Sequence, residues 1–184
     1  MKKVLIFILL VWSFQVVHAQ KMNAHKKAIL ASIDKHQDVL IAISDSIWAL
    51  AETAFNEGQS AEILASYAEA NGFKVNRGVA DIPTAFTATY GSGNPVISVL
   101  GEFDALPGIS QKAQPTKEAL IDGAAGHGCG HNLFGTGSLG AAIAVKELIE
   151  AGKIKGTVKF LRTNTGMGFI TGEDGKEYFR NMLL

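Results

Sequence analysis

Three side chains of the kind that bind divalent metals occupy alternate positions of a glycine-rich segment. His127, Cys129 and His131 are separated by single glycines, and 7 of the 18 residues from 123 to 140 are glycine. Because glycine adds no side chain and frees the backbone, the main chain can aim these groups. Imidazole and thiolate together suit zinc and other late divalent ions of the first transition row. A closed structural zinc site needs about four donors, so the pattern predicts part of an open metal site. The alternative is a loop with incidental histidines.

A carboxylate directly after a predicted strand is the second candidate for chemistry. Residues 96–100 form an almost wholly apolar run, which is typical of a strand buried on both faces of a parallel sheet. Asp104 follows this run and is well placed to orient a metal-bound histidine, and Glu102 is a weaker candidate for the same role. The alternative for Asp104 is a turn or helix-capping aspartate.

A thiol nucleophile is a competing interpretation of the same residues. Cys129 with His127 or His131 would then form a catalytic Cys–His pair. However, two positions of separation across a glycine do not fix an ion pair, and catalytic Cys and His residues generally come from distant parts of a chain. A metal site is therefore the favoured interpretation, and a Cys–His thiol hydrolase the less favoured one.

The rest of the chain alternates predicted helices and strands. Helices are expected over about 23–53, from a capping Ser60 to Ala70, and over about 132–151, and strands over 73–79, 85–90, 96–100 and 156–161. This order favours an α/β fold with a parallel or mixed sheet. In such sheets ligands bind beyond the carboxyl ends of the strands, which is where Asp104 lies.

Length and composition exclude several classes of protein. The chain has 184 residues, of which 47% are hydrophobic and 18% charged, as expected for one folded domain or one domain with part of another. Basic and acidic residues number 17 each, which gives no electrostatic case for nucleic acid. The single cysteine excludes an intramolecular disulfide.

The first residues have the pattern of a signal peptide. Lys2 and Lys3 precede an apolar run over 4–12, and Val-His-Ala at 17–19 offers a cleavage site before Gln20. A membrane anchor is the alternative, but it needs about 20 apolar residues and polar residues interrupt this run. We therefore expect export to the periplasm or secretion. Since a free thiol is a liability in an oxidising compartment, Cys129 is expected to be occupied.

Two ordered motifs give the chain a family resemblance. Residues 101–108 read Gly-Glu-Phe-Asp-Ala-Leu-Pro-Gly, and residues 126–133 read Gly-His-Gly-Cys-Gly-His-Asn-Leu, followed by Gly-Thr-Gly at 135–137. Over roughly 25–161 the chain resembles the metal-dependent amidohydrolases and aminoacylases that include hippurate hydrolase and the indole-acetyl-amino-acid hydrolases. It is especially similar to the branch of the aminobenzoyl-glutamate hydrolase B subunits.

The resemblance implies a fold, a reaction and a set of site residues. The fold is a three-layer α/β/α zinc-peptidase-like domain, with a smaller lid and dimerisation domain that we expect to be absent from this chain. Two divalent metals (Zn, Mn, Co or Ni) would activate water to attack the amide carbon of an N-acyl or aminobenzoyl amino acid or a dipeptide-like substrate. Carried over, Cys129 and His131 are metal ligands and Asp104 is the orienting carboxylate. His127 is a third candidate, more a supporting residue than a ligand. Neither a nucleic-acid partner nor a stable membrane span is implied.

The chain departs from the family after the strand at 156–161. The family continues with Gly-Thr-Pro-Ala-Glu-Glu, in which the first glutamate is the general base and the second a metal ligand. Here residues 162–168 read Arg-Thr-Asn-Thr-Gly-Met-Gly. We therefore predict a signal peptide at 1–19, the N-terminal part of the catalytic domain at 20–161 and a divergent tail at 162–184.

These segments predict an incomplete and inactive amidohydrolase, the alternative being a non-catalytic remnant or binding module that keeps the fold. A shift of reading frame is one hypothesis for the tail, because codons for Glu-Trp-Gly read one base off can give the Gly-Met-Gly found at 166–168. Half a sheet would also leave 156–161 as an exposed edge strand.

Overall fold

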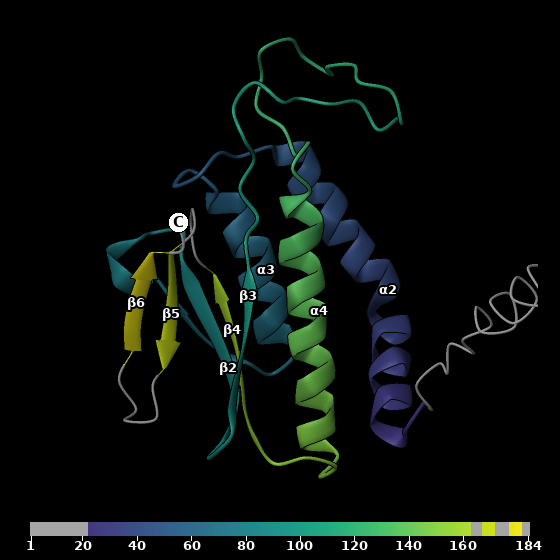
Figure 1. Ribbon diagram of the computed structural model, residues 1–184, viewed down its shortest axis with the longest axis vertical. Helices are drawn as coiled ribbons and strands as arrows, with labels where there is room; N and C mark the ends of the chain where they lie inside the picture. The colour runs from purple at the N-terminus through teal and green to yellow at the C-terminus, as the bar shows by residue number, and fades with distance from the viewer. Residues whose placement is uncertain (1–21, 163–166, 172–176, 182–184) are drawn as a thin grey trace, which may run out of the picture.

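A computed structural model describes the backbone of residues 22–162, 167–171 and 177–181 (Figure 1). Its helices are α2 (Ala24–Leu50), α3 (Gly58–Ala70) and α4 (His131–Glu150), with a short 3₁₀ turn, η1 (Val79–Asp81). Its strands are β1 (Lys74–Arg77), β2 (Phe86–Ser92), β3 (Val96–Gly101), β4 (Gly156–Arg162), β5 (Met167–Thr171) and β6 (Glu177–Asn181). The predicted signal peptide lies outside the described residues. No helix in the described ranges is long and apolar enough to cross a membrane.

The main sheet is mixed, which confirms the predicted α/β class. Its strand order is β1-β2-β4-β3, with β3 parallel to β4 and the other neighbours antiparallel. The prediction that 156–161 forms an edge strand is wrong, because β4 lies between β2 and β3. The tail adds β5 and β6, which pair with each other antiparallel.

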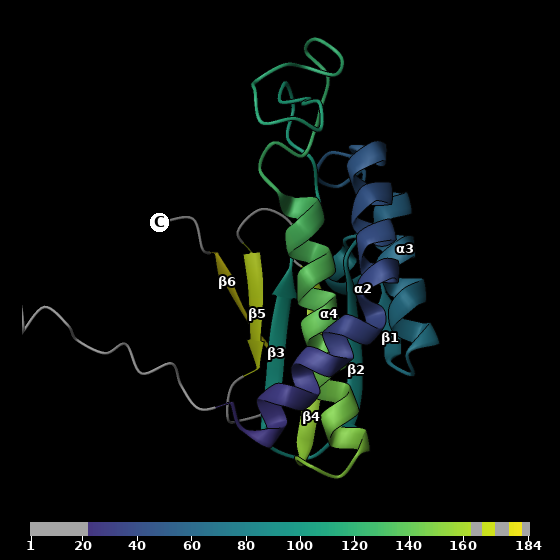
Figure 2. The same ribbon diagram turned by 90° about the vertical axis from the view of Figure 1, so that its right-hand side faces the viewer.

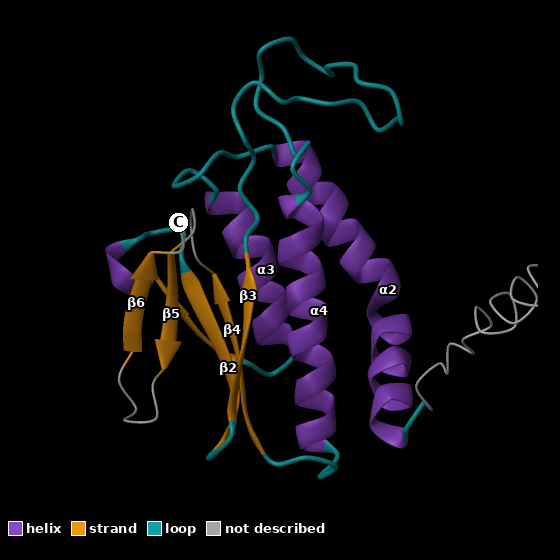
Figure 3. Ribbon diagram, in the orientation of Figure 1, coloured by secondary structure: helices purple, strands orange, loops and turns teal. Residues whose placement is uncertain are grey.

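Helices α2, α3 and α4 cover one side of the main sheet, and the β5–β6 pair lies on the other (Figures 2 and 3). The core between sheet and helices is built around Phe86, whose ring centroid lies 5.5 Å from that of Phe160 and 6.2 Å from that of Phe103. Ile47 of α2 and Leu139 of α4 are fully buried against them. Full burial of each such side chain contributes roughly 1.5–3 kcal/mol to stability. The described residues thus form the sheet and one helical layer.

Strand β3 is less buried than its apolar sequence predicts. Val96 and Ile97 are 43% and 45% exposed, so the expectation of burial on both faces is wrong at this end of the strand. The reason is topological: in the described sheet β3 is an edge strand whose neighbour is β4. Burial increases toward Gly101, where the strand runs beneath α4.

The helix ends follow local capping chemistry. Asn23 caps α2 by accepting a hydrogen bond from Lys26 N at 2.9 Å. The prediction that Ser60 caps the second helix is wrong, because α3 begins two residues earlier. Ser60 instead donates from N and Oγ to Glu52 at 2.8 and 2.7 Å. A carboxylate at this position also interacts favourably with the positive end of the helix.

Helix α4 approaches the end of β3 so closely that a glycine is required between them. A Cβ on Gly135 would lie 2.8 Å from Glu102 O and 2.9 Å from Phe103 Cβ, both too short for a side chain. Gly137, two positions further along the same helix, has no atom within 4 Å of such a Cβ. The contact at Gly135 sets the distance between the helix and the loop that follows β3.

We expect Gly135→Ala to lower the free energy of unfolding by about 1–3 kcal/mol, because the added methyl must push α4 away from the strand. The matched change Gly137→Ala should be neutral or stabilise by up to about 1 kcal/mol, because alanine favours helix. Urea unfolding of the full chain measures both. Equal effects of the two substitutions would contradict the close approach.

Candidate metal centre

The candidate site lies where the carboxyl end of β3 meets the start of α4. Glu102 and Asp104 follow β3 directly, and His131 is the first residue of α4. The segment 102–130 rises as a long loop above the sheet and returns to the helix (Figure 1). Two elements far apart in sequence therefore bring their polar ends together, at the carboxyl edge where α/β sheets bind ligands.

Asp104 and His131 form the central contact of the site. His131 Nδ1 lies 3.0 Å from Asp104 Oδ1, and Asp104 is only 2% exposed. Because a carboxylate can only accept, it favours the imidazole tautomer with the proton on Nδ1, which leaves the lone pair on Nε2. Glu102 Oε2 lies 3.4 Å from that Nε2. A buried carboxylate on one nitrogen and an available second nitrogen is the usual arrangement around a metal-binding histidine.

Backbone hydrogen bonds hold both ends of the loop. Ala105 N donates to Glu52 O at 2.7 Å, and Leu106 and Gly126 exchange two N–H···O bonds of 3.1 Å. A Cβ on Gly126 would lie 2.6 Å from Ser110 Cα, so this crossing also needs glycine. At the other end Gly130 adopts a φ of 85°, a left-handed conformation that starts α4.

The other two sequence candidates lie in different environments. Cys129 is an exposed free thiol, and within the described residues it makes no hydrogen bond to either neighbouring histidine. His127 is 2% exposed, with its ring centroid 6.5 Å from that of Trp48. Burial lowers the pKa of His127 below its usual value and outweighs the backbone of Ile47, which raises it. His127 is therefore a neutral, buried histidine at neutral pH.

The donor types fit a divalent metal, but the described residues do not gather a complete set. Among them, no group of three or more His, Cys, Asp or Glu side chains is arranged to hold a metal ion. Imidazole, thiolate and carboxylate are suitable donors for zinc-like ions. The roles of Cys129, His131 and His127 toward a metal stay predictions, and the Asp104–His131 contact favours the role of His131.

Trp48 has a place in the neighbouring cavity that its sequence position did not indicate. It lies at the end of α2 and lines a pocket of about 310 Å³ together with His127 and part of the long loop. In the sequence Trp48 is one residue of a predicted helix. It lines a pocket only because the long loop folds back beside it. No sequence signal joined it to His127.

Solved structures share the fold of this chain. A putative aminohydrolase from methicillin-resistant Staphylococcus aureus superposes with a TM-score of 0.62 at 20% identity, covering 76% of this chain and 35% of that one. A dinuclear metal-binding peptidase of the M20 family from Bacillus subtilis superposes with a TM-score of 0.60 at 24% identity, covering 72% and 36%. At these identities the likeness establishes a shared α/β fold. No family model matches the chain.

The sequence comparison identifies the relationship. Over 121 residues the chain is 54% identical to the B subunit of the p-aminobenzoyl-glutamate hydrolase of Escherichia coli K12, a match covering 64% of this chain and 25% of the relative. The predicted resemblance to this branch is confirmed over the matched residues. It spans about a quarter of the length of the curated relatives it matches.

If Asp104 orients His131 for a metal, replacing its carboxylate should weaken metal binding without removing a ligand. We expect Asp104→Asn to lower the affinity for Zn²⁺ about 10–100-fold, because the amide no longer fixes the histidine tautomer. Competition between the purified full chain and a chelating dye measures this. Asp122→Asn, at an exposed carboxylate of the same loop, is the control and should leave the affinity unchanged. An unchanged affinity in Asp104→Asn would contradict the orienting role.

Proposed function

We propose that this chain carries the metal-binding part of an amidohydrolase that cleaves the amide bond of an aminobenzoyl or other N-acyl amino acid. The contact between Asp104 and His131 at the carboxyl end of β3 carries the proposal. The relationship to a p-aminobenzoyl-glutamate hydrolase supports the substrate class. The dinuclear metal-binding peptidase with the same fold supports one or two divalent ions, for which Zn, Mn, Co and Ni are the candidates.

The chain's own residues would prepare the site in three ways. Asp104 accepts the Nδ1 proton of His131 and so directs the Nε2 lone pair outward. The first turn of α4 brings the positive end of a 20-residue helix to the candidate site, where it would stabilise negative charge that develops on an amide oxygen. Cys129, which is exposed, is accessible to an incoming ion. A bound divalent ion would supply Lewis-acid polarisation of the amide carbonyl.

We further propose that the chain by itself does not turn over substrate. Where the family has its Glu-Glu pair, residues 162–168 contain no glutamate. Loss of a general base typically lowers a rate by about 10²–10⁴-fold, and loss of a ligand weakens the metal clamp as well. The function retained would then be metal and ligand binding.

The purified full chain, loaded with Zn²⁺ or Mn²⁺, should bind metal yet release no p-aminobenzoate from p-aminobenzoyl-glutamate above the rate of metal-free protein. Metal content and product release are measured on the same preparation, with Cys129→Ala as the variant that should lose metal. Turnover that chelation removes would contradict the proposed inactivity. Turnover that survives chelation but is lost on alkylation of Cys129 would favour the thiol hydrolase.

We also propose that the chain is exported and cleaved before Gln20, on the strength of the basic and apolar pattern of residues 1–19. Expression of the full chain in a bacterial host should yield a periplasmic or secreted product whose N-terminal residue, determined by mass spectrometry, is Gln20. Recovery of uncleaved chain from the membrane fraction would favour an anchor instead.

A further inference from the structure

A pocket separates the end of α2 from the long loop beside the candidate metal centre. Its volume is about 310 Å³, near the lower end of the range for small-molecule sites. One wall is Trp48 with neighbouring residues of α2, and the other is formed by the loop, including Leu120 and Ile121. None of its lining residues is Asp, Glu, Lys or Arg. The pocket therefore suits an uncharged, mainly apolar group.

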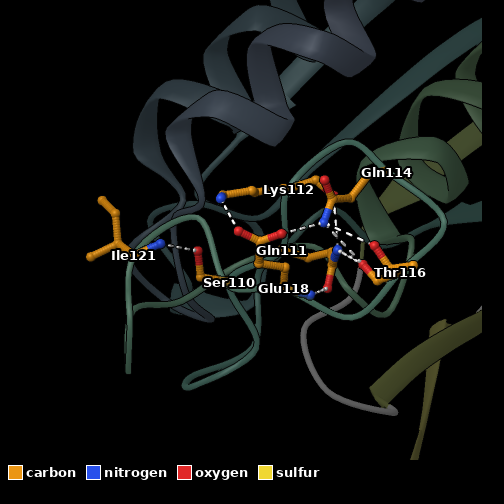
Figure 4. Close-up of polar contacts among 7 residues, drawn as sticks. All are labelled: Ser110, Gln111, Lys112, Gln114, Thr116, Glu118 and Ile121. Carbon is orange, nitrogen blue, oxygen red and sulfur yellow. Dashed lines mark hydrogen bonds and ion pairs between the residues drawn. The ribbon is translucent and has the colours of Figure 1, made fainter.

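The loop's own polar side chains in this pocket are already engaged. Ser110 Oγ accepts a hydrogen bond from Ile121 N at 3.2 Å. Gln111 donates to the carbonyls of Lys112 and Thr116, both at 2.9 Å, and accepts from Glu118 N at 3.2 Å (Figure 4). These hydrogen bonds join residues within the loop and so hold this wall of the pocket in place. The Gln111 side chain is therefore largely occupied and has little capacity left to bind a guest.

His127 is the buried polar side chain of the lining that has unused hydrogen-bonding capacity. It is 2% exposed, and neither ring nitrogen has a hydrogen-bond partner of normal geometry among the described residues. The backbone of Ile47 is close enough to affect the ring, but one backbone group can satisfy only one nitrogen. At least one buried imidazole nitrogen is therefore left without a partner. Such a group is costly to bury unless something binds it.

The geometry of the aromatic side chains favours a flat guest. The rings of Trp48 and His127 are inclined by 31° with centroids 6.5 Å apart, and both residues line the pocket. Offset and tilted packing of aromatic rings at such distances is favourable beyond simple burial. An aromatic ring carrying one hydrogen-bonding atom matches these walls better than a branched aliphatic group does.

We propose that this pocket binds an uncharged aromatic carboxamide, with Trp48 contacting the ring and His127 hydrogen-bonding its polar atom. This deepens the proposed function and rests on it, because the guest is then the aromatic acyl half of the substrate. His127 lies two residues before Cys129 in the chain, and the proposal directs the amide of the guest toward the candidate metal centre. His127 is here a specificity-determining residue and not a metal ligand.

The test measures binding without metal or hydrolysis, so its failure is separate from failure of the proposed function. The probe is 4-aminobenzamide, titrated into the full chain carrying Trp12→Phe, in which Trp48 is the single tryptophan. Trp48 fluorescence should change saturably. Cyclohexanecarboxamide should bind at least several-fold more weakly because it is not flat. The anion p-aminobenzoate should also bind more weakly, because the pocket offers no cation for its charge.

Two variants probe the pocket from different walls. His127→Phe keeps a flat ring but removes the hydrogen bond, and should weaken binding of 4-aminobenzamide about tenfold. Ala124→Phe, in the loop wall, should abolish binding by filling the pocket, and it tests the same proposal if His127→Phe does not fold. His25→Phe, at an exposed histidine outside the pocket, is the matched control and should leave the affinity unchanged.

The proposal is overturned if 4-aminobenzamide does not perturb Trp48 at millimolar concentration, or if folded Ala124→Phe binds it as well as the parent chain does. Equal affinity for the flat and the non-flat amide would overturn it too. Binding of the amide by a chain that binds neither Zn²⁺ nor Mn²⁺ would sustain the pocket and count against the proposed metal centre alone.

Discussion

The hydrogen bond between Asp104 and His131 joins the end of a strand to the start of a helix across 27 positions of sequence. Asp104 is almost fully buried, and a buried carboxylate is stable only with partners for its charge. Its position thus requires His131 to be close, which in turn requires α4 to begin at this edge of the sheet. This hydrogen bond therefore does two things: it links the end of β3 to the start of α4, and it orients the imidazole ring of His131.

Glycines make that meeting sterically possible. Gly135 lets α4 lie against the backbone of Glu102, and Gly126 lets the returning loop cross Ser110. Residues of the loop that closes at Gly126, between Ser110 and His127, form the second wall of the pocket beside Trp48. The candidate metal centre and the pocket are therefore two results of one loop closure, with His127 lying between them.

The chain matches one part of much longer relatives. The described residues hold a carboxylate–histidine pair and a neighbouring pocket, but they do not gather three metal donors. The matched region of the relatives is about a quarter of their length, so residues that complete a site in a longer protein have no counterpart in that match.

The sequence by itself predicted most of the elements and the candidate residues of the site. The spacing of apolar residues and the capping residues predicted the ends of α2, α4 and β4 to within a few positions. The motifs at 101–108 and 126–133 indicated Asp104, Cys129 and His131 as candidate site residues. Ser60 was misassigned as a cap because the carboxylate that binds it, Glu52, comes from outside the helix. Only the tertiary structure decided that β4 is interior and β3 an edge, since strand order depends on pairings between distant segments. It alone placed Trp48 opposite His127, because a cavity depends on how a loop folds back and local sequence does not encode that.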